Sequence, residues 1–385
     1  MMNRIKSLLG IEQRSFDPYW SDFLAKRTGT VTVDAAQSLA ACYAAVSVIS
    51  EAVGSLPLHL YKRDGDERER ADSHPLYAVL HHAPNEYQSA QEFIEWLTAS
   101  MLLHGNGYAR ITRGHDGQVR SLFPLAPERV NIKRHGDVIA GYEYINLDGR
   151  SEKLLPDEVF HLRHRAGGDP LVGLSPIAAA RGVFELALSE QAHGQSSFDN
   201  GTRLSGTLNV PGVLKPEQRE ALKASWQAQY AGAANAGRVP VLEAGTTFSP
   251  VSMTLEDSEW VAARQFSVQE VARVFKVPPV LIGDLTHANF SNSVEMNRWF
   301  VTHTLQRHMS AWEGAISRQL LSSAGRRIYF PEFSAEGLLR GDAANRANFY
   351  EKAINSGWMT IAEVRKLENL PAIKSDRFKP MEPPK

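Results

Sequence analysis

Cysteine is nearly absent from the sequence, which has Cys42 as its single cysteine among 385 residues. An intrachain disulfide needs two cysteines and a cysteine-based zinc cluster needs more, so both are excluded. This usage is typical of a protein that assembles in a reducing compartment such as the cytoplasm. Cys42 falls on the apolar stripe of a predicted helix that begins at a capping Asp34, so we interpret it as a core residue. The stripe consists of Leu39, Cys42, Tyr43, Val46, Ile49 and Val53.

An excess of either charge is also absent, because 42 Lys and Arg side chains are balanced by 43 Asp and Glu side chains. The net charge of −1 indicates neither a broad basic surface for holding nucleic acid tightly nor an acidic tail. Long apolar runs are missing as well, and no segment is apolar enough to span a bilayer. Residues 1–11 lack the apolar core and cleavage site of a signal peptide, and we expect no membrane partner.

Sequence signatures of catalysis are scarce. The phosphate-binding pattern G-x-x-x-x-G-K-[ST] does not occur, so the sequence offers no ATPase of its own. The run Gly-Leu-Ser-Pro-Ile at 173–177 is similar to the G-x-S-x-G turn of serine hydrolases, but it lacks the second glycine. Pro176 has no N–H group to donate to an oxyanion, so we reject a hydrolase with Ser175 as nucleophile and interpret Ser175 as a helix cap.

The histidines do not form a recognisable metal site. His161 and His164 lie at a spacing that, on a strand, points their side chains to opposite faces. We therefore expect no metal, no cofactor and no enzymatic activity. Two further pairs lack a matching carboxylate or thiol pattern, namely His81 with His82 and His303 with His308.

The segment 257–321 has the clearest pattern in the sequence. Its first part predicts a helix whose apolar face carries Val261, Val268, Val271, Ala272 and Phe275. The following Val-Pro-Pro at 277–279 should end this helix, since proline restricts the preceding residue and cannot donate to a helical ladder. Residues 285–293 then read as an exposed polar loop, and 294–321 as a longer helix. The stripe of this longer helix consists of Val301, Leu305, Met309, Trp312, Ile316 and Leu320.

The rest of the chain predicts an α+β protein. A strand-rich tract follows a helix at 88–103, and a second helix spans 175–200. Between 201 and 250 we expect a small α/β insert with a strand at 205–210, a helix at 216–229, a linker at 230–237 and a strand at 239–242. Further strands are expected at 56–61, 108–111, 119–125, 129–133, 141–146, 159–163 and 326–330, a charged turn at 62–72, and C-terminal helices at 338–355 and 360–367.

Several short runs resemble one known family. The run FKVPPVLIGD at 275–284, followed by NFSN at 289–292 and by Glu295, closely resembles the portal proteins of tailed bacteriophages, in particular the HK97-like family. Other runs agree in order along residues 35–370. They are LPLHLY at 56–61, HPL at 74–76, GNGYA at 105–109, GLSPI at 173–177, FDNG at 198–201 and LLRGD at 338–342.

This resemblance implies a portal fold with a mixed α/β wing, a two-helix stem, a small α/β clip, a long spine helix and a short helical crown. The implied parts are a flexible arm (1–33), the wing (34–174), stem helices (175–200 and 256–277), the clip (201–250), a tunnel loop (285–293), the spine helix with a strand (294–333), the crown (334–370) and a disordered tail (371–385).

The resemblance also implies a ring, usually of twelve subunits, at one vertex of a virion capsid that is assembled in the host cytoplasm. Its partners would be double-stranded DNA without sequence preference, the large terminase subunit, a head-completion adaptor and the major capsid protein. A non-catalytic cytoplasmic scaffolding or adaptor protein is the alternative, and it would form a smaller oligomer or a monomer. The implied functional residues are His287, Asn289, Phe290, Ser291 and Asn292 in the tunnel loop, Pro278 and Pro279 at the helix stop, and Tyr230, Gly232, Asn235 and Gly237 in the clip linker.

Overall fold

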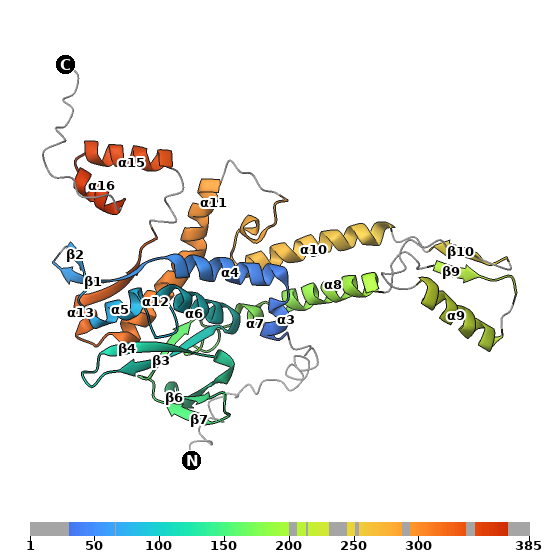
Figure 1. Cartoon of the computed structure of the whole chain (residues 1–385), viewed down its shortest axis with the longest axis horizontal. Helices are drawn as coiled ribbons and strands as arrows, with labels where there is room; N and C mark the ends of the chain where they lie inside the picture. Colours follow the sequence, from blue (N-terminus) through green and yellow to red (C-terminus); the bar gives the residue numbers. More distant parts are fainter. Residues whose placement is uncertain are drawn as a thin grey trace, which may run out of the picture. The chain divides into compact units, whose positions relative to one another are not determined.

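The computed structural model describes residues 31–65, 67–199, 206–212, 215–230, 245–250, 254–286, 293–335 and 343–368. Helices and small antiparallel sheets alternate along the chain, which confirms the predicted α+β class (Figure 1). The chain divides into two compact units. We call residues 1–48, 99–107 and 163–284 the helix-pair unit, and residues 49–98, 108–162 and 285–385 the sheet unit.

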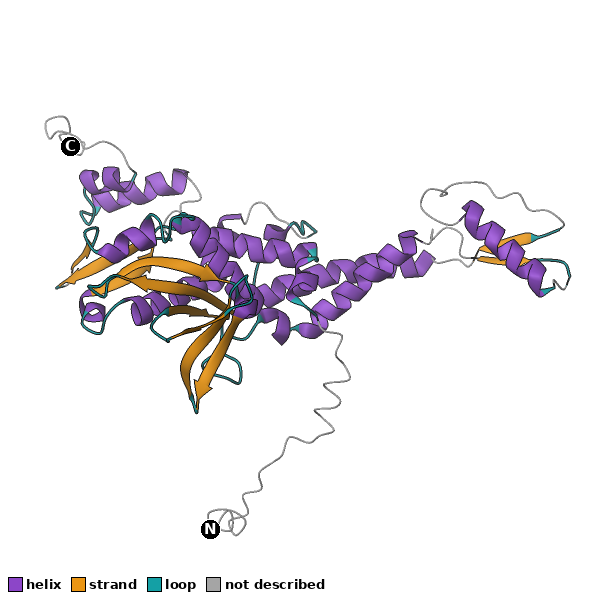
Figure 2. Ribbon diagram, turned by 60° about the horizontal axis from the view of Figure 1, so that its bottom comes forward, coloured by secondary structure: helices purple, strands orange, loops and turns teal. Residues whose placement is uncertain are grey.

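The β-structure of the chain consists mainly of three-stranded antiparallel sheets (Figure 2). Two of them share a core of Tyr108, Leu125, Tyr142, Leu154 and Val159, so the predicted strand-rich tract is one lobe built from two sheets. Strand β7 (Ser151–Leu154) was not predicted, because its Ser-Glu-Lys-Leu sequence has only one apolar side chain. The first sheet contains β4 (Val119–Leu125), β3 (Asn106–Arg113) and β8 (Val159–Arg163), and the second contains β5 (Val130–His135), β6 (Val138–Ile145) and β7 (Ser151–Leu154).

A third three-stranded sheet, with strands at 329–333, 58–64 and 67–70 in this order, corrects two predictions. The predicted charged turn at 62–72 is a hairpin of β1 (Leu58–Asp64) and β2 (Glu67–Arg70). Its charged residues are held across the sheet, where Arg68 donates to both oxygens of Glu332 at 2.7 Å. Strand β11 (Tyr329–Phe333) begins later than the predicted 326, because Gly325–Ile328 form the short helix α13.

The predicted long helix of the sheet unit is present and has the expected buried stripe. It consists of α11 (Ser293–Trp299), a π-helical segment (Phe300–Leu305) and α12 (Gln306–Leu320). Trp312 in α12 is fully buried, donates from Nε1 to Thr98 Oγ1 at 3.0 Å, and packs against Phe93 and Phe160. Apolar spacing gave no signal for the π segment, because a single wide turn keeps the same residues on the buried face.

Two shorter helices carry local start signals that the sequence contains. Helix α5 (Pro75–His81) begins after His74, whose side chain accepts from the N–H of Leu76. Helix α6 (Ala90–His104) begins after Ser89, which exchanges hydrogen bonds with Glu92. The C-terminal helices are α15 (Ala343–Asn355) and α16 (Ile361–Leu367). The start of the predicted helix at 338–342 lies outside the described residues.

The first predicted helix differs from expectation in two respects. It is split into α3 (Val33–Gln37) and α4 (Ala40–Ser55), and its cap is Thr32, whose Oγ1 accepts from the N–H of Ala35 at 3.1 Å, rather than Asp34. Tyr43 is 64% exposed, so it does not belong to the buried stripe. Cys42 is buried as predicted, and burial raises the pKa of its thiol to about 12.

The helix-pair unit contains the two longest α-helices of the described chain, α8 (Arg181–Asp199) and α10 (Thr254–Phe275). The predicted single helix 175–200 is interrupted at Ala180, because α7 (Pro176–Ala179) is separate from α8. Between α8 and α10 the chain forms β9 (Gly206–Asn209), α9 (Pro216–Tyr230) and β10 (Thr247–Pro250), with β9 and β10 paired antiparallel. The strand predicted at 239–242 lies outside the described residues. Searched across the described ranges, no helix is both long and apolar enough to cross a membrane.

Buried His59 in strand β1 should make the stability of the sheet unit depend on pH. Its side chain is only 6% exposed, and its Nδ1 lies 3.5 Å from the hydroxyl oxygen of Tyr77. Burial is the main reason why the pKa of His59 falls from 6.5 to about 4. Four neighbours have smaller effects on this pKa, since Arg70 and His81 lower it while Asp72 and Glu332 raise it.

We expect acid to weaken folding as the pH falls from 6.5 towards about 4. In the unfolded chain His59 takes up a proton near pH 6.5, whereas in the folded chain it stays neutral until about pH 4. The contribution of neutral His59 to the free energy of unfolding is therefore complete above pH 6.5 and is lost as the pH falls below it. At pH ~5 the loss should be about 2 kcal/mol, measured as the free energy of unfolding in urea at pH ~7.5 and ~5. The variant His59→Asn cannot take up this proton and should lose less stability. Equal losses in both proteins would contradict the assignment.

Candidate functional site

Helices α8 and α10 pack against each other along their length and run antiparallel (Figure 1). As the residue numbers increase along α8, the residues that they contact on α10 have decreasing numbers. The rings of Phe184 and Phe275 are 6.4 Å apart, and Ser267 Oγ donates to Glu190 Oε2 at 2.7 Å. Farther along the pair, a Cβ atom on Gly194 would lie 2.5 Å from Cζ2 of Trp260. The indole therefore occupies the space that a side chain at 194 would need, and the two helices approach closely there.

The base of this pair is a joint between two runs that the sequence singled out. Asn106 forms a two-way bond with the backbone of Gly173, since Nδ2 donates to its carbonyl at 3.1 Å and Oδ1 accepts from its N–H at 2.8 Å. The N–H of His164 donates to the carbonyl of Gly105 at 2.8 Å. Gly105 has φ +80°, a conformation that favours glycine. The joint fixes the end of α6 to the start of α7.

Ser175 at this joint is a helix cap, as the sequence predicts. Its Oγ accepts from the N–H of Ala178 at 3.3 Å and donates to the carbonyl of Leu103 at 2.6 Å. Both roles are structural, because one bond starts helix α7 and the other ties it to α6. The hydroxyl hydrogen of Ser175 is thus directed at a backbone carbonyl rather than at a general base.

The end of α10 adopts a Schellman motif ahead of the two prolines. The N–H of Val277 donates to the carbonyl of Ala272 at 2.9 Å, and the N–H of Lys276 donates to that of Arg273 at 3.1 Å. Lys276 has φ 56°, and among the described residues it is the only one other than glycine with a positive φ. The helix therefore ends at Phe275, and a short 3-10 turn over Pro279–Ile282 follows.

The predicted loop and linker residues are mostly outside the described structure. The loop is described at its two ends, through residue 286 and from residue 293 onward. In the linker, the described chain stops at Tyr230, the last residue of α9. The following site residues therefore lie outside the described ranges, namely His287, Asn289, Phe290, Ser291 and Asn292 in the loop, and Gly232, Asn235 and Gly237 in the linker.

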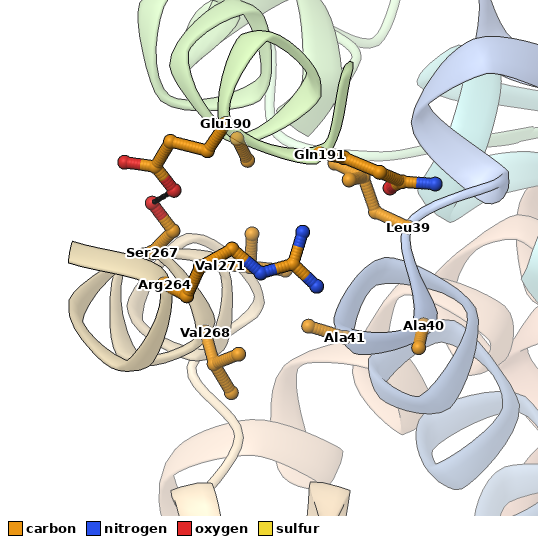
Figure 3. Close-up of a pocket in the computed structure, with 10 residues that line it drawn as sticks. Leu39, Ala40, Ala41, Glu190, Gln191, Arg264, Ser267, Val268 and Val271 are labelled. Carbon is orange, nitrogen blue, oxygen red and sulfur yellow. Dashed lines mark hydrogen bonds between the residues drawn. The ribbon is translucent and has the colours of Figure 1, made fainter. Parts of the chain in front are cut away.

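A cavity of about 70 Å³ lies within the helix-pair unit (Figure 3). Its walls come from the junction of α3 and α4, from α8 and from α10, and it opens to the surface. Ligand pockets usually measure about 300–1,000 Å³, so this cavity has the size of a side chain rather than of a cofactor. Its lining consists of Leu39, Ala40, Ala41, Ala187, Glu190, Gln191, Arg264, Ser267, Val268 and Val271.

The histidines named in the sequence do not come together as a metal centre in the described part of the chain. His161 is buried, and its Nδ1 lies 3.1 Å from the hydroxyl oxygen of Tyr142. Its backbone pairs in both directions with the side-chain amide of Gln319, at 2.7 and 3.0 Å. Over the residues that the structure describes, no group of three or more His, Cys, Asp or Glu side chains could hold a metal ion.

Sequence reasoning missed the contacts that hold the helix pair together. Asn106 belongs to the run at 105–109, which only the family resemblance singled out, and its partner Gly173 lies 67 residues away. Gly194 gave a weak signal, because a glycine inside a predicted helix costs about 1 kcal/mol relative to alanine and suggests a close contact. Val261 was assigned to the apolar face of α10, but it is 50% exposed.

Comparisons with known proteins identify similar sequences and structures. A family profile described as "Phage portal protein" matches residues 40–369. The portal protein of Enterobacteria phage HK97 is 36% identical over 333 residues, which cover 85% of this chain and 78% of that protein. A chain from the neck of an empty GTA particle, computed with C6 symmetry, is similar with a TM-score of 0.60 and 29% identity, over 86% of this chain and 90% of that one. For the neck of a native GTA particle, computed with C12 symmetry, the TM-score is 0.57 and the identity 28%, with the same coverage.

Proposed function

Because the chain belongs to the phage portal protein family, we propose that it forms a ring, usually of twelve subunits, through which DNA enters and leaves a capsid. The observation that carries this proposal is the antiparallel pair of α8 and α10, which an α/β insert connects in sequence. Two long antiparallel helices can line a channel, because the backbone hydrogen bonds of each helix are satisfied within that helix. They would form the stem, and the insert would form the clip.

The other elements take their roles from the same arrangement. Residues 285–293, between the turn after α10 and the long helix of the sheet unit, would be the tunnel loop, and Pro278 and Pro279 would set the angle at which it leaves the stem. Helices α11 and α12 would be the spine, and α15 with α16 the crown. The remaining described strands and helices would belong to the wing. The ring would sit at one vertex of the virion and touch the major capsid protein, after assembly in the host cytoplasm.

The near-neutral charge of the chain suits a channel through which DNA moves better than a protein that binds DNA tightly. Each phosphate that a protein neutralises adds salt-dependent affinity, which would retard a moving duplex. The net charge of −1 limits such contacts, and residues 285–293 contain neither lysine nor arginine. Neutral side chains there can form hydrogen bonds worth about 0.5–1.5 kcal/mol each, which a translocating DNA can break and reform. We assign no catalytic role to Ser175, and the energy for packaging would come from the large terminase subunit.

Size-exclusion chromatography with light scattering, followed by negative-stain imaging, tests the ring directly. We expect a large cyclic particle with an axial hole and a mass close to twelve times the 42.7 kDa chain. A scaffolding or adaptor protein would instead elute as a monomer or a small oligomer without a hole. That result would contradict the proposal.

The tunnel loop should touch DNA during packaging. A photocrosslinking probe at Asn289 should capture DNA in packaging heads, because the loop would project into the channel. The matched control is a probe at His115, an exposed residue in the turn between β3 and β4. Equal capture at both positions would show that the loop does not line the channel.

The clip linker should be needed for packaging but not for folding. Residues 230–237, with Tyr230, Gly232, Asn235 and Gly237, would give the clip surface that the terminase and later the head-completion adaptor share. A deletion of 230–237 should leave rings intact in negative stain and reduce packaged DNA to background. Normal packaging by the deletion variant would refute this docking role.

A further inference from the structure

Helix α10 has different chemistry on two opposite faces. One face lines the cavity with Arg264, Ser267, Val268 and Val271. At about 100° per residue, Phe266 points about 200° away from Arg264, on the far side of the helix. Phe266 is 53% exposed, and the guanidinium of Arg273 lies 5.6 Å from the centre of its ring. We call Phe266 the knob of α10.

An exposed aromatic ring in the middle of a helix gains free energy if a partner covers it. Burial of a phenylalanine side chain is favourable because it removes a large apolar area from water. In a cyclic ring each contact is heterologous, which means that one face of a subunit meets a different face of the next subunit. A knob on one face of α10 and a cavity on the other therefore have the geometry that a ring contact requires.

The chemistry of the cavity fits an aromatic side chain better than a charged one. Apolar atoms of Leu39, Ala187, Val268 and Val271 form much of the lining. The carboxylate of Glu190 is already engaged by the hydroxyl of Ser267. Because the cavity opens to the surface, a phenyl ring needs to enter only in part. Exposed Arg264 lies at the edge of the cavity, where its guanidinium is 5.7 Å from the centre of the Trp260 ring of the same helix.

We infer that Phe266 of one subunit inserts into the cavity between α4, α8 and α10 of the next subunit. This inference rests on the proposed ring and adds the residues that join its subunits along the helix pair. The occupant of the cavity is thus a second copy of the same chain. Val261 provides a matched control, since it is 50% exposed on the same helix but lies about 140° away from Phe266.

Cysteine crosslinking in assembled rings tests the contact. Buried Cys42, with its thiol pKa raised to about 12, should not react. Oxidation of the double variant Phe266→Cys with Ala40→Cys should give a ladder of linked subunits up to the full ring on a denaturing gel. Each single variant should remain unlinked, because a heterologous contact joins unlike residues. The control pair Val261→Cys with Ala40→Cys should give no ladder.

A second measurement does not depend on disulfide geometry. Phe266→Ala should raise the protein concentration at which rings dissociate, whereas Phe266→Leu and the control Val261→Ala should leave it close to that of the wild type. Rings that form normally but show neither the ladder nor a weaker Phe266→Ala ring would overturn this contact and leave the portal assignment intact. If the wild-type chain forms no ring at all, both proposals fail.

Discussion

Replacing Gly173 with alanine should prevent the protein from folding. A Cβ atom at this position would lie 1.9 Å from the carbonyl oxygen of Gly105 and 2.7 Å from the backbone nitrogen of His164. A Cβ atom essentially never comes within 3.0 Å of a heavy atom outside its own residue and the two adjoining residues. Both obstacles are backbone atoms, so relief requires the two chain segments to separate rather than a side chain to rotate.

That separation would break the joint at the base of the helix pair. The bond from His164 to Gly105 and the two-way bond between Asn106 and Gly173 would be lost together, and Gly173 is buried. Each buried polar group left unpaired costs about 1–3 kcal/mol. The total should exceed the ~3 kcal/mol of ordinary overpacking and consume much of a typical stability of about 5–15 kcal/mol.

The experiment compares Gly173→Ala with Gly168→Ala, a substitution in the same connection between β8 and α7. A Cβ atom at Gly168 would meet no atom within 4 Å, and its φ is not positive. We expect soluble protein and a normal thermal unfolding curve for Gly168→Ala, and insoluble or unfolded protein for Gly173→Ala. A Gly173→Ala variant that melts like the wild type would show that the joint can open at little cost.

Local chemistry predicted most elements of this fold because their signals lie within a few residues. The stripe from Val301 to Leu320 requires only helical spacing, and the cap at Ser175 requires only a serine before a proline. The end of α10 ahead of Pro278 follows from the chemistry of proline. These features do not depend on which part of the chain packs against them.

Burial and partners could not be predicted in the same way, because they depend on distant neighbours. Val261 fits the same helical repeat of apolar residues as Val268. It lies about one turn before Arg264, however, and Arg264 is the first residue of α10 that lines the cavity. Tyr43 is next to buried Cys42 and points outward. The partnership of Asn106 with Gly173 spans 67 residues, so no periodic pattern could reveal it.

The two glycines of α8 should respond to alanine with opposite signs. At Gly182, near the start of the helix, a Cβ atom would meet nothing within 4 Å, so alanine should stabilise by up to about 1 kcal/mol through helix propensity. At Gly194, a Cβ atom would lie 2.5 Å from Cζ2 and 3.2 Å from Cη2 of Trp260. The same substitution there should destabilise by about 1–3 kcal/mol despite the gain in propensity.

The reason for the difference is that the ring of Trp260 cannot yield at little cost. Its Nε1 donates to the carbonyl of Glu190 at 3.4 Å, and the guanidinium of Arg264 lies 5.7 Å from the ring centre. Moving the ring would therefore disturb the same stretch of α10 whose Ser267 bonds to Glu190. Thermal unfolding of the two variants measures the sign directly, and Gly194→Ala with Trp260→Phe should recover stability, because the smaller ring leaves room for a methyl group. If Gly194→Ala is as stable as Gly182→Ala, the close approach of α8 and α10 is not what holds the helix pair together.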